Sequence, residues 1–219
     1  MKNQVVSLAS VLLTVFMGLN PCSAGVTNIL DNGGFEDGVL EPWSIYDNIG
    51  GTVTAEVVSG LGGAAIPESP IEGALCLHIV VPEAGAVSYD ASLRYTGHVF
   101  EAGKKYTLSA FLKSKEDTLP VTMKTELDVD PWTYYARETI TMTEEWAEYS
   151  VTTSVLSETV DPGVVTFLMA LEPGDFWIDG VRFYEGDYVS PSTIPAPGAI
   201  LLGLAGTGIV GALRRRKVI

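Results

Sequence analysis

The chain has 219 residues, of which 47% are hydrophobic and 18% are charged, and its formal net charge is −14. Five of the 13 Lys and Arg residues lie in the two terminal segments, whereas all 27 acidic residues lie between them, so the central domain is strongly acidic. This charge disfavours nucleic acid, anionic lipid and anionic polymer as partners, and it suits neutral ligands and divalent cations. Without its ends, the chain is long enough for one domain with a substantial core.

Residues 1–24 have the pattern of a secretory signal peptide. Lys2 precedes an apolar stretch over residues 5–19, and small residues stand where a signal peptidase would cut after Ala24. A lipoprotein signal centred on Cys22 is the alternative, but Pro21 fits a lipid-attachment motif poorly. Cleavage would leave Cys76 as the one cysteine, so no internal disulfide could form, and its strand-like context predicts a buried apolar residue.

From residue 28 onward, short alternating or β-branched runs are separated by Gly, Pro, Asn and Asp, which predicts an all-β domain over residues 25–184. About ten short strands with regularly spaced turns favour a two-sheet antiparallel β-sandwich of the jelly-roll type over a closed barrel. Residues 60–73 are predicted to form a loop. The predicted strands are residues 43–46, 52–58, 74–81, 87–93, 106–113, 121–127, 136–142, 147–153, 164–170 and 176–183.

The run over residues 105–113 shows the pattern most clearly. Four apolar residues alternate with polar ones, which predicts that one face of this strand is core: Tyr106, Leu108, Ala110 and Leu112. Phe111 is the exception on the polar face. It indicates either second-layer packing or part of a ligand surface.

The C-terminal tail predicts a membrane segment. Residues 185–196 are rich in Ser and Pro and suit a spacer, residues 197–213 are apolar, and residues 214–219 begin with a basic cluster. Because basic clusters resist translocation, this end should stay cytoplasmic and the domain should lie outside. The sequence therefore predicts an exported protein at the cell surface, flanked by a signal peptide and a transmembrane helix.

This tail resembles the PEP-CTERM sorting signal of exported bacterial proteins. The resemblance rests on Pro195 and Pro197, the Gly-rich apolar run, and the closing cluster of Arg214, Arg215 and Arg216. It implies recognition by an exosortase-type protease, cleavage near the prolines and release into extracellular polysaccharide. Ala196 stands where the family usually has Glu. The alternative is an ordinary membrane anchor that stays in place.

Three further segments together resemble the carbohydrate-binding modules of families 4, 9 and 22. They are Asn32-Gly33-Gly34-Phe35-Glu36 followed by Trp43, the stretch from Pro131-Trp132 to Tyr149, and Phe176-Trp177-Ile178-Asp179. Their order and spacing cover nearly the whole domain. The resemblance implies a jelly-roll β-sandwich that binds polysaccharide.

Glu36 and Asp179 are the candidate metal ligands. If the first and last strands are neighbours, the two carboxylates come together, and carboxylates with loop carbonyls suit Ca²⁺. In the resembled modules a structural calcium is held at these motif positions, so the resemblance assigns Glu36 and Asp179 that role. The alternative is two solvated acids at strand ends.

The middle motif supplies the candidate carbohydrate-binding residues. Sugar rings pack their C–H faces on aromatic rings while polar side chains bind the hydroxyl groups, so a site needs both kinds of residue. Trp132 has core burial as its alternative, whereas Trp146, Tyr149 and Trp177 are assigned to packing. The candidate residues are Trp132, Tyr134, Tyr135, Asp130 and Arg137.

Catalysis finds little support in the sequence. His78 and His98 have no Ser, Cys or second His at motif spacing, and acidic pairs mean little in so acidic a chain. The leading hypothesis is an exported non-catalytic carbohydrate-binding protein. A structural or adhesive matrix protein without sugar binding is the second, and a polysaccharide-active enzyme is the third.

Overall fold

The computed structural model describes residues 26–59 and 71–190. These residues form one 3-10 helix, η1 (Ser88–Asp90), and ten strands. The strands are β1 (Ser44–Asp47), β2 (Thr54–Ser59), β3 (Leu75–Val81), β4 (Ala91–Phe100), β5 (Tyr106–Ser114), β6 (Leu119–Leu127), β7 (Tyr134–Met142), β8 (Ala147–Thr152), β9 (Val160–Leu168) and β10 (Gly174–Glu185).

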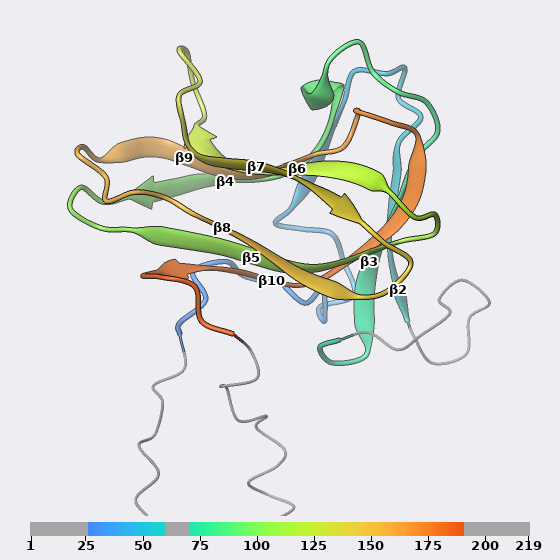
Figure 1. Ribbon diagram of the computed structural model, residues 1–219, viewed down its shortest axis with the longest axis horizontal. Helices are drawn as coiled ribbons and strands as arrows, with labels where there is room; N and C mark the ends of the chain where they lie inside the picture. The colour runs from blue at the N-terminus through green and yellow to red at the C-terminus, as the bar shows by residue number, and fades with distance from the viewer. Residues whose placement is uncertain (1–25, 60–70, 191–219) are drawn as a thin grey trace, which may run out of the picture. The chain divides into compact units, whose positions relative to one another are not determined.

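The strands form two five-stranded sheets that pack face to face (Figure 1). Sheet A has the order β1-β4-β9-β6-β7, and sheet B has the order β2-β3-β10-β5-β8. Neighbouring strands are antiparallel throughout both sheets. The structure therefore confirms the predicted all-β, two-sheet antiparallel sandwich.

Strand β5 shows why the alternating pattern folds in this way. Its four predicted inward residues are buried in the core between the sheets, where removing apolar surface from water drives folding: Tyr106, Leu108, Ala110 and Leu112. Phe111 is half-buried on the opposite face of sheet B. A Cβ on Gly180 would lie 3.1 Å from the Phe111 ring, so this ring packs over β10. Phe111 therefore matches the second-layer alternative.

The opening motif anchors the N-terminal segment in the core. Phe35 is fully buried and Trp43 is 2% exposed, and Trp43 packs edge-to-face on Tyr95 with ring centroids 5.1 Å apart. The indole Nε1 of Trp43 donates to the carbonyl of Asn32 at 3.3 Å. Burying two large aromatic rings in this way stabilises the sandwich by several kcal/mol, roughly 2–3 kcal/mol for each ring.

Gly33 brings this opening motif against the last strand. Its carbonyl accepts the Val181 N–H at 2.8 Å, and a Cβ at this position would stand 2.1 Å from the Val181 carbonyl oxygen. Only a residue without a side chain allows the two backbones to approach so closely. The first and last motifs of the domain are therefore neighbours, although the first and last strands, β1 and β10, lie in different sheets.

The predicted strand over residues 87–93 is wrong in its first half. Residues 88–90 form η1, and β4 begins only at Ala91 but continues to Phe100. The carboxylate of Asp90 accepts the Val87 N–H and the Asn48 side-chain N–H, both at 3.0 Å. Such a local side-chain bond to the backbone competes with a strand ladder and closes a turn instead.

Several predictions concern residues outside the described ranges. The signal peptide over residues 1–24, the transmembrane segment over residues 197–213, the basic tail over residues 214–219 and the sorting-signal residues Pro195, Pro197, Arg214, Arg215 and Arg216 all lie there. Within residues 26–59 and 71–190, no helix is long and apolar enough to cross a membrane.

The beginning of the predicted spacer is described, and it lies against the domain. The Tyr188 hydroxyl donates to Glu148 at 2.5 Å, and the Val189 N–H donates to the Tyr184 hydroxyl at 2.8 Å. Cys76 is fully buried, as predicted, and this burial raises the pKa of its thiol to about 12. The thiol therefore stays protonated and unreactive at neutral pH.

Candidate functional site

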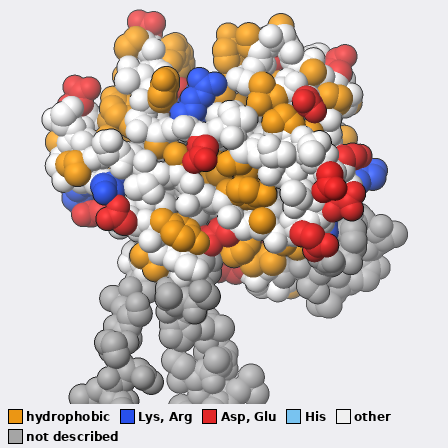
Figure 2. Space-filling model, viewed as in Figure 1, with side chains coloured by type: hydrophobic (Ala, Val, Ile, Leu, Met, Phe, Trp, Pro, Cys, Tyr) orange, Lys and Arg blue, Asp and Glu red, His pale blue; other side chains and the backbone are white. Residues whose placement is uncertain are grey.

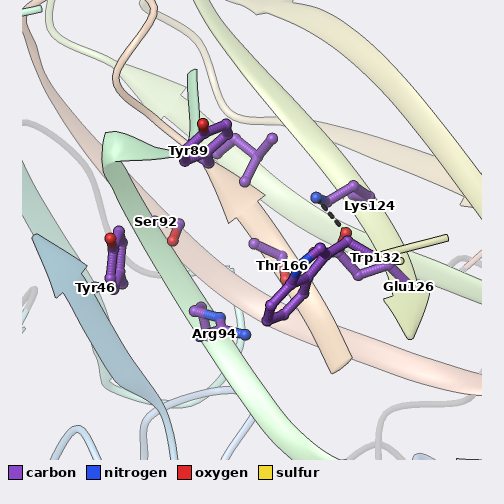
Figure 3. A pocket seen from close by; sticks show the side chains of 9 residues that line it. Tyr46, Tyr89, Ser92, Arg94, Lys124, Glu126, Trp132 and Thr166 are labelled. Carbon is purple, nitrogen blue, oxygen red and sulfur yellow. Dashed lines mark hydrogen bonds and ion pairs between the residues drawn. The ribbon is translucent and has the colours of Figure 1, made fainter. Parts of the chain in front are cut away.

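A groove crosses the outer face of sheet A, away from the core. It encloses about 420 Å³, and the molecule is hollowed between two raised parts on this side (Figure 2). Figure 3 shows the side chains that line it, which come from β1, η1 and the β6–β7 loop at its sides and from β4, β6 and β9 at its floor. The lining residues are Tyr46, Tyr89, Ser92, Arg94, Lys124, Glu126, Trp132, Thr166 and Leu168.

The strand register builds the floor of the groove. Residues directly opposite each other in an antiparallel pair point to the same face. Arg94 of β4 faces Thr166 of β9, and Thr166 faces Lys124 of β6. One row of the floor therefore places a hydroxyl between two cations. In the next row Ser92 lies opposite Leu168, which gives the floor a mixed polar and apolar character.

Trp132 forms one wall of the groove. Trp132 is 52% exposed and has a left-handed backbone with φ of 57°. The loop between β6 and β7 that carries it is pinned by backbone bonds from Trp132 N–H to the Val129 carbonyl at 2.7 Å and from Asp128 N–H to the Pro162 carbonyl at 2.8 Å. The ring is thus held out from the core, and the core-burial alternative for Trp132 is wrong.

Two tyrosines stand on the opposite side of the groove from Trp132 (Figure 3). Tyr46 of β1 is 44% exposed, and Tyr89 of η1 is 56% exposed. The hydrogen bonds that Asp90 accepts from Asn48 and Val87 lower the pKa of its carboxyl group, so this acid stays ionised and fixes the short helix. The groove therefore has aromatic rings on both sides of a polar floor.

Two ion pairs set the charge of the floor. Arg94 pairs with Asp128 at the base of the Trp132 loop. Lys124 pairs with Glu126 at 2.6 Å, and the side chains of both are largely shielded from water, at 12% and 8% exposure. Charged groups near the surface but partly desolvated form stronger hydrogen bonds than they do in bulk water. The floor therefore offers fixed donors and acceptors at close range.

The Thr166 hydroxyl is an unsatisfied polar group in this floor. Thr166 is 1% exposed, and its Oγ1 has no hydrogen-bond partner. A buried hydroxyl without a partner costs about 1–3 kcal/mol, and such a group in a folded protein calls for an explanation. Thr166 lies between Arg94 and Lys124, so the unsatisfied hydroxyl belongs to the floor of the groove.

The structure brings three of the five predicted carbohydrate-binding residues to this face of sheet A. Trp132 lines the groove. Tyr134 of β7 is 58% exposed and lies opposite Glu126 of β6. Arg137 is exposed opposite Lys124, with its guanidinium carbon 5.8 Å from the centre of the Tyr134 ring. Tyr134 and Arg137 thus continue the floor toward the edge of the sheet.

The other two predicted residues lie elsewhere. Tyr135 is half-buried against the hydrophobic core, and burial together with the charge of Glu158 raises the pKa of its phenol. The β6–β7 pairing shifts register here: Thr125 pairs with Ala136 and Glu126 with Tyr134, so Tyr135 has no partner in the ladder and leaves the face that carries Tyr134. Asp130 is exposed in the Trp132 loop but does not line the groove.

Sequence reasoning missed most of the floor and the tyrosine wall. The missed lining residues come from β1, η1, β4, β6 and β9: Tyr46, Tyr89, Ser92, Arg94, Lys124, Glu126, Thr166 and Leu168. Their signal is weak, because each occupies only an outward position in an alternating strand or a short turn. Lys124 and Glu126, two residues apart in an otherwise uncharged strand, were the one local indication.

Glu36 and Asp179, the predicted metal ligands, hold the same short segment ahead of β3. Asp179 is fully buried, and its Oδ2 accepts the N–H groups of Ile71 at 2.7 Å and Glu72 at 2.8 Å. Glu36 Oε1 accepts the N–H groups of Ala74 at 2.9 Å and Leu75 at 2.8 Å. Neither carboxylate is simply a solvated acid at a strand end.

Burial dominates the electrostatics of Asp179. Desolvation raises the pKa of this carboxyl group to about 7, although hydrogen bonds from the Glu72, Gly180 and Ile71 N–H groups oppose the shift. In the described part of the chain, no three His, Cys, Asp or Glu side chains are grouped so as to hold a metal ion. Both oxygens of Asp179 and the Oε1 of Glu36 accept backbone N–H groups in this arrangement, and calcium stays a prediction.

The two histidines take part in packing. His78 pairs with Asp175 and stacks on Trp177, with ring centroids 4.9 Å apart. His98 stacks on Tyr95 with centroids 4.6 Å apart, and burial lowers the pKa of its imidazole. Both rings therefore serve as flat packing partners, and His98 stays neutral at pH 7.

A β-sandwich with an aromatic-walled polar groove on one face is the architecture of a ligand-binding module. Residues 27–173 match the family CBM_4_9, described as a carbohydrate binding domain. The chain therefore belongs to this carbohydrate-binding family. No curated protein sequence matches it.

Solved structures with the same fold include three carbohydrate-binding modules. The second N-terminal cellulose-binding domain of Cellulomonas fimi β-1,4-glucanase C is 21% identical, with a TM-score of 0.54 over 76% of this chain and 99% of that one. The CBM22-1 xylan-binding domain from Paenibacillus barcinonensis is 12% identical, with a TM-score of 0.52 over 75% and 97%. A CBM61 module in complex with β-1,4-galactotriose is 18% identical, with a TM-score of 0.50 over 74% and 99%. At these identities the likeness concerns the fold.

Proposed function

We propose that this protein binds polysaccharide without cleaving it, through the groove on sheet A. The observation that carries the proposal is the Trp132 indole, which is half exposed above a floor of hydrogen-bonding side chains. An exposed aromatic ring gains by covering its face with the C–H surface of a sugar, because that removes apolar area from water. A buried ring would have nothing to gain.

The backbone at Trp132 supports this proposal. A bulky side chain in the left-handed region costs roughly 1–2 kcal/mol, and Gly or Asn would carry the same turn with less strain. Trp132 nevertheless occupies this position, with φ of 57°. Phe35 has the same φ but lies fully buried in the core, whereas at Trp132 the strained backbone carries a half-exposed ring that core packing does not account for.

The floor supplies the polar half of the interaction. Sugar hydroxyl groups both donate and accept, and the floor offers the donors Arg94 and Lys124 beside the acceptor Glu126. A ligand hydroxyl that displaces neighbouring side chains slightly could also pair the Thr166 Oγ1, which has no partner in the free protein. Tyr46 and Tyr89 provide a second stacking wall across the groove.

A glycan array followed by affinity gel electrophoresis tests the proposal. The wild-type protein should be retarded by at least one polysaccharide, and Trp132→Ala should abolish the retardation while circular dichroism stays unchanged. Tyr188→Ala is the matched control, because Tyr188 is an exposed aromatic bound to Glu148 of sheet B. Absence of binding to every glycan would favour a structural matrix protein, and release of reducing ends would favour an enzyme.

Export and surface attachment form the second part of the proposal. It rests on the sequence of residues 1–24 and 191–219, with secretion through the first segment and membrane delivery, followed by exosortase-type processing, through the second. Cell fractionation of the full chain and of a chain ending at residue 190 tests it. Only the full chain should be found with membranes or the cell surface, and equal distributions would refute the anchoring role.

A further inference from the structure

The groove face gathers cations in a protein that has few of them. Arg94, Lys124 and Arg137 belong to a single row across sheet A, in which Arg94 faces Thr166, Thr166 faces Lys124 and Lys124 faces Arg137. All three therefore point toward the same face. They represent three of the eight Lys and Arg residues between the two terminal segments.

The pairing of Lys124 with Arg137 breaks a local rule of sheet stability. Like charges directly opposite each other on neighbouring strands destabilise a sheet. The chain has 27 acidic residues against 13 basic ones, so an acid opposite Lys124 would be the more ordinary choice. Places where a sequence departs from local rules without a structural benefit are expected to be functional.

The acids near the row leave one end of it unbalanced. Asp128 pairs with Arg94, and Lys124 uses one of the three N–H donors of its ammonium group to bind Glu126. Arg137 makes no ion pair with any residue in the described ranges, and its guanidinium lies over the Tyr134 ring. The end of the row formed by Lys124 and Arg137 therefore keeps hydrogen-bond donors and positive charge on the face of sheet A that carries the groove.

We propose that the groove takes an acidic polysaccharide, with a sugar carboxylate held by Arg137 and Lys124 while Trp132 stacks on the ring. This inference rests on the proposed function and adds the chemical class of its ligand. A guanidinium binds a carboxylate through two parallel hydrogen bonds, and the ammonium of Lys124 adds a point charge.

The net charge of −14 opposes the approach of a polyanion from a distance. At physiological ionic strength the Debye length is about 8 Å, so the row in contact with the ligand outweighs acids on other faces. The local charge therefore replaces the expectation, drawn from the net charge alone, that the partners are neutral.

Matched polymers test this inference by isothermal titration calorimetry in about 0.15 M salt, the ionic strength at which distant charges are screened. Glucuronoxylan is compared with its carboxyl-reduced form, and polygalacturonate with its methyl ester. One acidic form should bind about tenfold more tightly than its neutral partner. Arg137→Gln should lower that affinity roughly three- to tenfold and weaken binding of the neutral form by a smaller factor, because only the acidic form loses a charged partner.

Lys105→Gln is the matched control, because it changes the net charge equally at the start of β5, where Lys105 pairs with Asp187. If it weakens binding as much as Arg137→Gln does, bulk charge explains the effect and the row does not. Equal affinity for acidic and neutral forms, or binding only to uncharged glycans on the array, overturns the acidic ligand and leaves the carbohydrate-binding function standing. Failure to bind any glycan overturns both.

Discussion

Because the backbone at Trp132 is left-handed, two substitutions can separate the effect of backbone strain on stability from the effect of losing the indole ring. Trp132→Ala and Trp132→Gly both remove the half-exposed indole, so both lose the same packing and the same stacking surface. They differ in the backbone, because Ala keeps the strain of φ 57° and Gly does not. Any difference in stability between the two variants therefore measures the strain.

The left-handed conformation costs a residue with a Cβ roughly 1–2 kcal/mol, while Gly gives up about 0.5–1 kcal/mol because its unfolded chain is more flexible. The Gly variant should be more stable than the Ala variant by about 1 kcal/mol. For a domain of this size, that difference corresponds to roughly 2–4 °C in melting temperature. Urea and thermal unfolding followed by circular dichroism measure it.

Thr133, the next residue in the same loop, provides the control, since it is not among the residues with positive φ. There the order should reverse, with Thr133→Gly less stable than Thr133→Ala. Both Trp132 variants should lose about 2 kcal/mol of binding free energy, or roughly 30-fold in affinity. If Ala is as stable as Gly at position 132, the left-handed backbone does not strain the side chain and the argument from strain fails.

Three further outcomes are expected. Because the pKa of Asp179 is raised to about 7 in the folded state from 3.8, its contribution to stability is greatest below about pH 4 and is lost as pH rises through 7. In EDTA, Asp179→Asn should remove this fall, and parallel melting curves of wild type and variant between pH 5 and 8 would contradict the buried-acid argument. If Ca²⁺ binds at Glu36 and Asp179, chelation should lower the melting temperature of the wild type but not of Asp179→Asn, and an unchanged wild-type value would remove calcium from the account. Gly33→Ala should destabilise the domain by about 3 kcal/mol or more, because its Cβ would stand 2.1 Å from the Val181 carbonyl oxygen. A loss of about 1 kcal/mol lowers the melting temperature of such a domain by roughly 2 °C or more, so a smaller shift would show that the two backbones can separate.

Local patterns were sufficient for the architecture of this protein. The alternation in the run from Tyr106 to Leu112 specified which side of β5 is core, because the side-chain period of a strand is two and burial rewards only one face. The close approach of Gly33 to the Val181 carbonyl, in contrast, appeared only in the structure. The predicted strand at residues 87–93 failed in its first half, where the Asp90 side chain closes a turn that no periodicity records.

The groove was decided by the tertiary structure. The sequence pointed to Trp132, because an aromatic residue among polar ones in a loop is a local feature, but it could not separate Tyr134 from Tyr135, which a register shift turns to different surroundings. Arg94 and Lys124 lie 30 residues apart in the chain and become neighbours only because β9 pairs with both of their strands. Periodicity along one strand determines what is buried, whereas the pairing between strands determines which outward side chains meet, and a binding site depends on the second.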